Sequence, residues 1–160
     1  MTKTGIAAIA LCALLAGCET FSDTRMAPDR PWRPVAQREC MFNNCTVEVR
    51  VVNGQVEVDA QEVRMARVSR DVIMRWVIVT PGYEFRATGD FLAPIIFKGD
   101  NAADAPGQFS QRRVGARGQV VSIQNQNRNS ARYTYKVRVY KQGGGSNDFL
   151  ESDPVIFNDF

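Results

Sequence analysis

The sequence predicts an all-β protein, an antiparallel β-sandwich of about seven to nine strands. Beyond residue 45, apolar residues recur at every second position in most segments, which is the period of a β-strand. Short runs of this kind follow one another at roughly ten-residue spacing, and no segment has a convincing helical period. The dipeptide Asn53-Gly54 separates two such runs, and it is the strongest short-range signal for a β-hairpin.

The hairpin around Asn53-Gly54 has a register that its side chains support. A two-residue turn places apolar residues opposite one another and opposite charges opposite one another. The expected pairs are Val52–Gln55, Val51–Val56, Arg50–Glu57 and Val49–Val58. Glu48 opposite Asp59 is the misfit, and we expect the pairing to fray there.

The other strands follow from alternation and turn chemistry. The run 72–79 is nearly all apolar, as expected for a central strand buried on both faces. Thr80-Pro81-Gly82-Tyr83 then has the proline and glycine of a type II turn. Residues 131–141 alternate cleanly, and "NQNRNS" at 125–130 is predicted to be a polar turn. Further strands are expected at 61–68, 83–87, 95–97, 108–114, 118–124 and 154–158.

Two stretches, "WVIVTPGYEF" and "YTYKVRVYK…LESDPVIFN", resemble segments of small exported sandwiches of the immunoglobulin-like and cupredoxin-like kinds. The resemblance spans most of residues 45–160. It does not extend to copper binding, because cupredoxins use two histidines and this chain has none. The paired cysteines that bridge the sheets of antibody-type domains lie far apart in sequence, and we do not expect Cys40 and Cys45 to bridge two sheets.

The N-terminus has the features of a secretory signal. Lys3 precedes an apolar run over residues 5–16, which is shorter than the roughly twenty residues that a membrane-spanning helix needs. Leu15-Ala16-Gly17-Cys18 resembles the lipobox of bacterial lipoproteins. The resemblance implies cleavage between Gly17 and Cys18, with lipid attached to Cys18. Glu19, by the sorting tendency of that family, implies an outer-membrane lipoprotein.

The expected organisation has three parts. Residues 1–17 are a lipoprotein signal peptide and residues 40–160 are the β-sandwich domain. Residues 18–39 are predicted to be a lipid-anchored linker, because Pro28, Pro31 and Pro34 disfavour helix and favour extended chain. Trp32, within this linker, is expected to pack on the domain.

Cys40 and Cys45 are predicted to form a disulfide. Cys12 leaves with the signal peptide and Cys18 is the proposed lipid site, so two of the four cysteines remain. An exported protein folds in an oxidising compartment, and Asn43-Asn44 permits a tight turn between the two.

Composition excludes several classes of function. The chain of 160 residues has no histidine, which rules out Ser-His-Asp catalysis, histidine-ligated metals and histidine pH switches. The formal net charge of +3 does not indicate a nucleic-acid-binding protein. We predict no metal site, no cofactor and no catalytic residue.

Three groups of side chains are candidate sites. Arg112, Arg113 and Arg117 could bind an anion, since guanidinium pairs with phosphate and carboxylate, although an ordinary solvated loop is the alternative. Glu84, Asp100 and Asp104 are weaker candidates for acid–base or calcium chemistry, with structural loops as the alternative. Tyr133 and Tyr135 could form a ligand platform, but at strand spacing they are expected in the core.

The function that these observations favour is a lipid-anchored envelope protein. Its periplasmic β-sandwich would be a non-catalytic binding or structural module, held at the membrane through Cys18, with an envelope protein or glycan as partner. The alternatives are a degenerate cupredoxin-like domain that holds a small ligand or metal through groups other than histidine, and a histidine-free enzyme that uses paired carboxylates.

Overall fold

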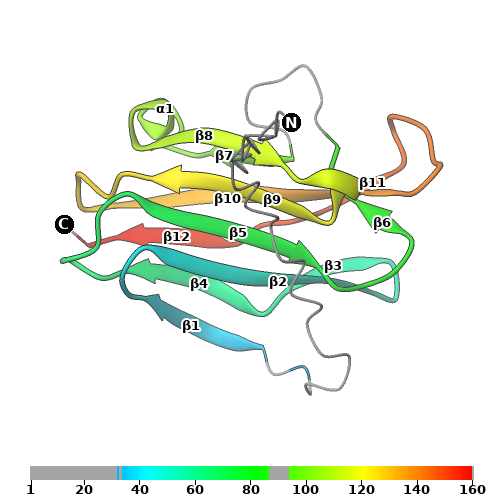
Figure 1. Ribbon diagram of the computed structural model, residues 1–160, viewed down its shortest axis with the longest axis horizontal. Coiled ribbons are helices and arrows are strands. Elements are labelled where there is room, and N and C mark those ends of the chain that lie inside the picture. Colours follow the sequence, from blue (N-terminus) through cyan, green and yellow to red (C-terminus); the bar gives the residue numbers. More distant parts are fainter. Residues whose placement is uncertain (1–31, 33, 87–93, 160) are drawn as a thin grey trace, which may run out of the picture. The chain divides into compact units, whose positions relative to one another are not determined.

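Two β-sheets packed together make up the part of the chain that the computed structural model describes, residues 32, 34–86 and 94–159 (Figure 1). Sheet A has seven strands in the order β1-β4-β12-β10-β11, with β6 and β7 also paired to β10. Sheet B has five strands in the order β3-β2-β5-β9-β8. The predicted all-β sandwich is therefore confirmed.

The strands are short and distributed along the whole described chain. Sheet A contains β1 (Val35–Cys40), β4 (Ala60–Met65), β6 (Tyr83–Glu84), β7 (Ile95–Lys98), β10 (Ala131–Lys141), β11 (Phe149–Ser152) and β12 (Val155–Asn158). Sheet B contains β2 (Asn44–Val52), β3 (Gln55–Val58), β5 (Val72–Ile78), β8 (Phe109–Val114) and β9 (Val120–Asn125). A single-turn helix, α1 (Ala105–Gln108), and a 3-10 turn, η1 (Ala116–Gly118), complete the described elements.

The hairpin of β2 and β3 has the register that the sequence predicts. Val49 pairs with Val58, Arg50 with Glu57, Val51 with Val56 and Val52 with Gln55. Asn53 and Gly54 adopt φ values of 51° and 76°, the left-handed geometry that this kind of turn requires. The agreement arises because apolar and charge pairing select the same register.

The chain crosses from sheet B to sheet A at Asp59, and the pairing with Glu48 does not fray there. The Asp59 amide donates to the Glu48 carbonyl at 3.0 Å, and the Glu48 amide donates to Asp59 Oδ1 at 3.0 Å. Asp59 is buried, and its carboxylate forms an ion pair with Arg38 Nη2 at 2.7 Å. The side chain that looked mismatched therefore replaces a backbone acceptor at the crossover.

Three strand pairings are parallel, so the sandwich is not purely antiparallel as predicted. They are β1 with β4, β12 with β4, and β2 with β5. Because β4 passes into the other sheet after β3, β5 returns to sheet B beside β2 and runs in the same direction. The period of two is the same in parallel and antiparallel strands, so alternation alone does not distinguish them.

Two strands, one short helix and one boundary differ from the sequence prediction. β1 begins at Val35, inside the range 18–39 that was expected to be linker, and β11 and α1 were not predicted. β1 is an edge strand, and its first three residues are all exposed, so it lacks the apolar alternation of a strand with one buried face. Trp32 packs against the domain as expected, with the Arg50 guanidinium 4.4 Å from its ring centre.

The core is aromatic at its centre. Trp76 from sheet B and Tyr135 from sheet A pack edge to face with ring centres 5.5 Å apart, and both are fully buried. Phe97 stacks on Phe109 at 4.3 Å, and Tyr133 packs edge-on against Phe109. Tyr133 and Tyr135 are therefore core residues, as predicted.

The central strand β5 is buried on one face and half-buried on the other, which corrects the prediction that both faces are buried. Val72, Met74, Trp76 and Ile78 point into the core, while the residues between them are partly exposed. Ile73 and Val77 point outward but are apolar, so the apolar run of β5 looked unbroken in the sequence.

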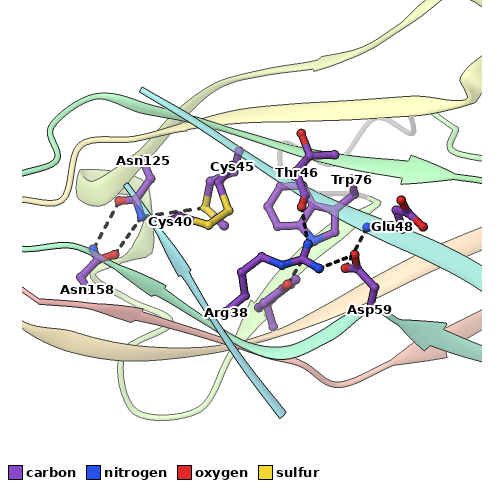
Figure 2. Close-up of a disulfide and its surroundings, with 11 residues drawn as sticks. Arg38, Cys40, Cys45, Thr46, Glu48, Asp59, Trp76, Asn125 and Asn158 are labelled. Atoms are coloured by element: carbon purple, nitrogen blue, oxygen red, sulfur yellow. Dashed lines mark hydrogen bonds and ion pairs between the residues drawn. A yellow bond between two sulfur atoms is a disulfide. The ribbon is translucent and has the colours of Figure 1, made fainter. Parts of the chain in front are cut away.

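The predicted polar turn 125–130 is partly a core element. Asn125 and Asn127 are fully buried, together with Asn158 from β12. The side-chain Nδ2 of Asn125 donates to Asn158 Oδ1 at 2.8 Å, and this hydrogen bond joins sheet B to sheet A (Figure 2). Asn127 Nδ2 donates to the carbonyls of Ala66 and Ser69. These asparagines are buried because hydrogen bonds satisfy much of their polarity.

Candidate functional site

The disulfide between Cys40 and Cys45 joins the two sheets. Cys40 ends β1, where it pairs with Met65 of sheet A, and Cys45 lies in β2, where it pairs with Met74 of sheet B. Their Cα atoms are 5.4 Å apart and both side chains are buried (Figure 2). The structure confirms the predicted pairing. It corrects the expectation that these cysteines do not bridge two sheets, because the short loop between them contains the crossover.

Arg38 fixes the two crossovers between the sheets that lie beside this disulfide, one in the loop between the cysteines and one at Asp59. Its guanidinium donates to the Thr46 carbonyl at 2.8 Å and to Asp59 Oδ2 at 2.7 Å, and Asp59 in turn accepts from the Glu48 amide (Figure 2). Arg38 comes from β1 and Thr46 from β2, so the arginine spans both sheets at their open edge. Arg38 and Asp59 are thus bonded to other groups of the fold, and we infer that they stabilise it and do not form a binding site.

The proposed lipid site cannot be placed by this structure. Gly17 and Cys18, with the rest of residues 1–31, lie outside the described residues, so lipidation remains a prediction from sequence. In the described part of the chain, no helix is long and apolar enough to cross a membrane.

The acidic candidates are not brought together. Glu84 pairs with Tyr140 at one end of β10, while Asp100 follows β7, whose Lys98 pairs with Thr134 at the other end. Glu84 Oε1 also accepts an ion pair from Arg86 Nε at 2.6 Å. Asp104 precedes α1 and makes no side-chain cap. Across the described ranges, no cluster of three or more His, Cys, Asp or Glu is placed to hold a metal ion.

Sheet A neutralises its own charges. In the ion pairs of the described residues, the cation lies in β1, β4, β7 or β10, except for Arg86, which lies two residues after β6. On its outer face, Lys136 and Arg138 both bind Glu151. Partial burial of Glu151 acts to raise its pKa, but the hydrogen bonds from Lys136 and Arg138 outweigh it and hold that pKa below its ordinary value.

Sheet B has a different charge pattern on its outer face. Its strands β5, β8 and β9, with η1, contain arginines and no acidic residue. Arg112 and Arg113 lie on edge strand β8, and Arg117 lies in η1 with a φ of 68°. The structure thus places the three predicted arginines in one region, where Arg112 is half-buried and Arg113 is exposed, and a bulge between Ser110 and Arg113 interrupts the pairing of β8 with β9.

The sheet register adds Arg75 to this region, a residue that was not among the predicted candidates. Arg75 of β5 pairs with Ser122 of β9, and Ser122 pairs with Arg113 of β8. Neighbouring residues Trp76 and Val121 point into the core, so all three members of this row point outward. The signal was present only in the pairing of β9 with β5, which is distant from β8 and β9 in sequence.

Large apolar side chains are exposed at one end of the sandwich. They lie in two loops, 41–43 after β1 and 66–71 after β4, which we call the end loops. Phe42 is 76% exposed, Val68 86% and Met41 56%. β1 and β4 run parallel with Cys40 beside Met65, so both loops leave the same end of sheet A, at the left of Figure 1. The sequence of residues 40–45 predicts a disulfide loop, and its two cysteines gave no signal that Met41 and Phe42 are exposed.

The shallow depression lined by Gln37, Glu39, Arg64 and Asp159 has little character of a binding site. It is open to solvent, and Arg64 and Asp159 are paired across it at 3.4 Å.

No protein family model matches this sequence, and no curated protein matches it. Function must therefore be inferred from the chemistry of this chain's own residues.

Proposed function

We propose that this protein is an outer-membrane lipoprotein whose periplasmic β-sandwich is a non-catalytic module that binds another envelope protein. The lipobox ending at Cys18 and the proline-rich segment after it support the anchor. The observation that carries the binding role is the exposed apolar surface of the end loops.

The composition of the end loops is that of a protein interface. Phenylalanine, methionine and arginine are enriched at interfaces over the rest of a protein surface. Here Met41 and Phe42 lie beside a loop that contains Val68, Arg67 and Arg70. A soluble domain gains nothing from exposing such side chains to water, whereas a partner that covers them gains their hydrophobic transfer free energy.

The end loops are also held in place by the core. The disulfide closes the loop that carries Phe42, and the Ile73 amide donates to the Asn43 carbonyl at 2.8 Å. The second loop is held by Asn127, whose side chain donates to the Ala66 and Ser69 carbonyls. Loops that are ordered before binding lose less entropy when a partner docks, so this geometry favours affinity.

A photocrosslinking amino acid in place of Phe42 tests this function in cells. We expect it to capture a discrete envelope protein, identified by mass spectrometry, from the lipidated full-length chain. The matched control replaces Val52, which is 39% exposed at the β2–β3 turn, and should not capture that protein. Equal capture from both positions, or none from Phe42, would contradict the binding role of the end loops.

A further inference from the structure

The outer face of β5, β9 and β8 contains two arginines, Arg75 and Arg113, that form no ion pair with any described residue. These strands and η1 contribute Arg75, Arg112, Arg113 and Arg117 and no aspartate or glutamate. Sheet A, in contrast, pairs its cations with acids of its own. The three strands β5, β9 and β8 therefore contain more cations than acids, and such a surface attracts an anion from outside.

Two of these arginines flank one hydroxyl group. Arg75 and Arg113 are the cross-strand partners of Ser122 on its two sides. Adjacent strands lie about 4.8 Å apart, so the two arginine Cα atoms lie roughly 10 Å apart with Ser122 between them. Arginine side chains are long enough for both guanidinium groups to reach an ion held above Ser122.

The charges in this row are available. Arg75 Nη1 donates to Asn44 Oδ1 at 2.6 Å, a bond to a neutral group that uses one of five guanidinium N–H donors. Arg113 is exposed, and neither arginine is in an ion pair with any described residue. Two acids lie near the row: Glu48 is two residues along β2 from the Thr46 that pairs with Arg75, and Asp71 accepts a hydrogen bond at 3.1 Å from Gln124, two residues along β9 from Ser122.

We propose that Arg75, Ser122 and Arg113 form a binding site for a phosphate group, supplied by a lipid headgroup or by a free phosphate ion. A tetrahedral phosphate has oxygens directed to both sides and downward, so two guanidinium groups and a hydroxyl bind it together. A carboxylate has two coplanar oxygens, which a single arginine satisfies. Arg117 adds positive potential near the site and increases the rate of anion capture.

Calorimetric titration of the lipidated full-length chain in a non-ionic detergent tests this site. The probes are inorganic phosphate and glycerophosphoglycerol, an acyl-free lipid headgroup. We expect the double variant Arg75→Gln/Arg113→Gln to bind at least tenfold more weakly than the parent. The control Arg64→Gln/Arg132→Gln removes the same charge from sheet A and should stay within twofold.

Each outcome decides the proposal or the source of the phosphate. Binding of inorganic phosphate alone assigns a free ion, and binding of glycerophosphoglycerol alone assigns a headgroup. Ser122→Ala should weaken binding severalfold at an unchanged unfolding temperature, which keeps the test decisive if the double variant does not fold. An equal loss in the sheet A control, or no binding of either probe to the parent, would overturn the site.

Discussion

Single polar side chains inside the core connect the two sheets. Trp76 Nε1 of sheet B donates to the Tyr135 hydroxyl of sheet A at 3.0 Å, and Asn125 donates to Asn158 across the same gap. Apolar packing alone has no direction, whereas these hydrogen bonds require one relative position of the sheets. The cost of breaking one is high because the partner is left buried without a bond.

Replacing Tyr135 with Phe tests this role of the core hydrogen bonds. The variant keeps the ring but leaves Trp76 Nε1 without its acceptor, so we expect a loss of about 1–3 kcal/mol in the free energy of unfolding. Denaturant unfolding followed by tryptophan fluorescence measures it. Tyr83→Phe, at a half-buried site, serves as the control, and equal small losses in both variants would show that the Trp76 bond is unimportant.

The Glu151 carboxylate predicts a pH dependence of stability. Its pKa is lowered in the folded protein, so its contribution is present above the unfolded pKa and is lost as the pH falls through the folded value. At pH 7 we expect the free energy of unfolding of the parent to exceed that of Glu151→Gln by about 1 kcal/mol. The two should converge towards pH 3 in denaturant titrations, and a gap that stays constant with pH would contradict the assignment.

Among the elements, β1 depends most on a covalent link. It pairs only with β4 in sheet A, lies at the sheet edge and is tied to sheet B by the disulfide. Removing both cysteines as Cys40→Ala/Cys45→Ala should lower the free energy of unfolding by about 2 kcal/mol, given the short loop that the bridge closes.

Hydrogen exchange locates this effect. In the variant without cysteines, the amides of β1 should lose protection well before those of β10, because β10 pairs on both edges. Uniform loss of protection across both strands would mean that β1 is not an independently opening element.

The sequence predicts those elements whose signal lies in one or two neighbouring segments. The β2–β3 register and strand β10 were predicted because alternation and turn chemistry there agree. β1 was not, since an exposed edge strand has no apolar face. The inter-sheet path of the disulfide depends on a crossover between the sheets, and the row of Arg75, Ser122 and Arg113 depends on the long-range pairing of β5 with β9; no local pattern contains either.

On the scale of the whole molecule, the described surface divides into regions of different chemistry. Sheet A has an outer face of internal ion pairs, sheet B exposes Arg75 and Arg113 in one cross-strand row, and the end loops expose apolar side chains. A domain tethered beside a membrane needs stability on its solvated face and recognition elsewhere. This division fits the binding role that we propose for the end loops.

Membrane attachment through Cys18 is the central claim, and cell fractionation of a Cys18→Ser variant tests it most directly. Two or more acyl chains anchor a protein stably, and without its acceptor thiol the chain has no site for the diacylglycerol. We predict that the parent stays with outer membranes and that the variant leaves this fraction. Retention of Cys18→Ser in the outer-membrane fraction at the level of the parent would contradict the lipid anchor.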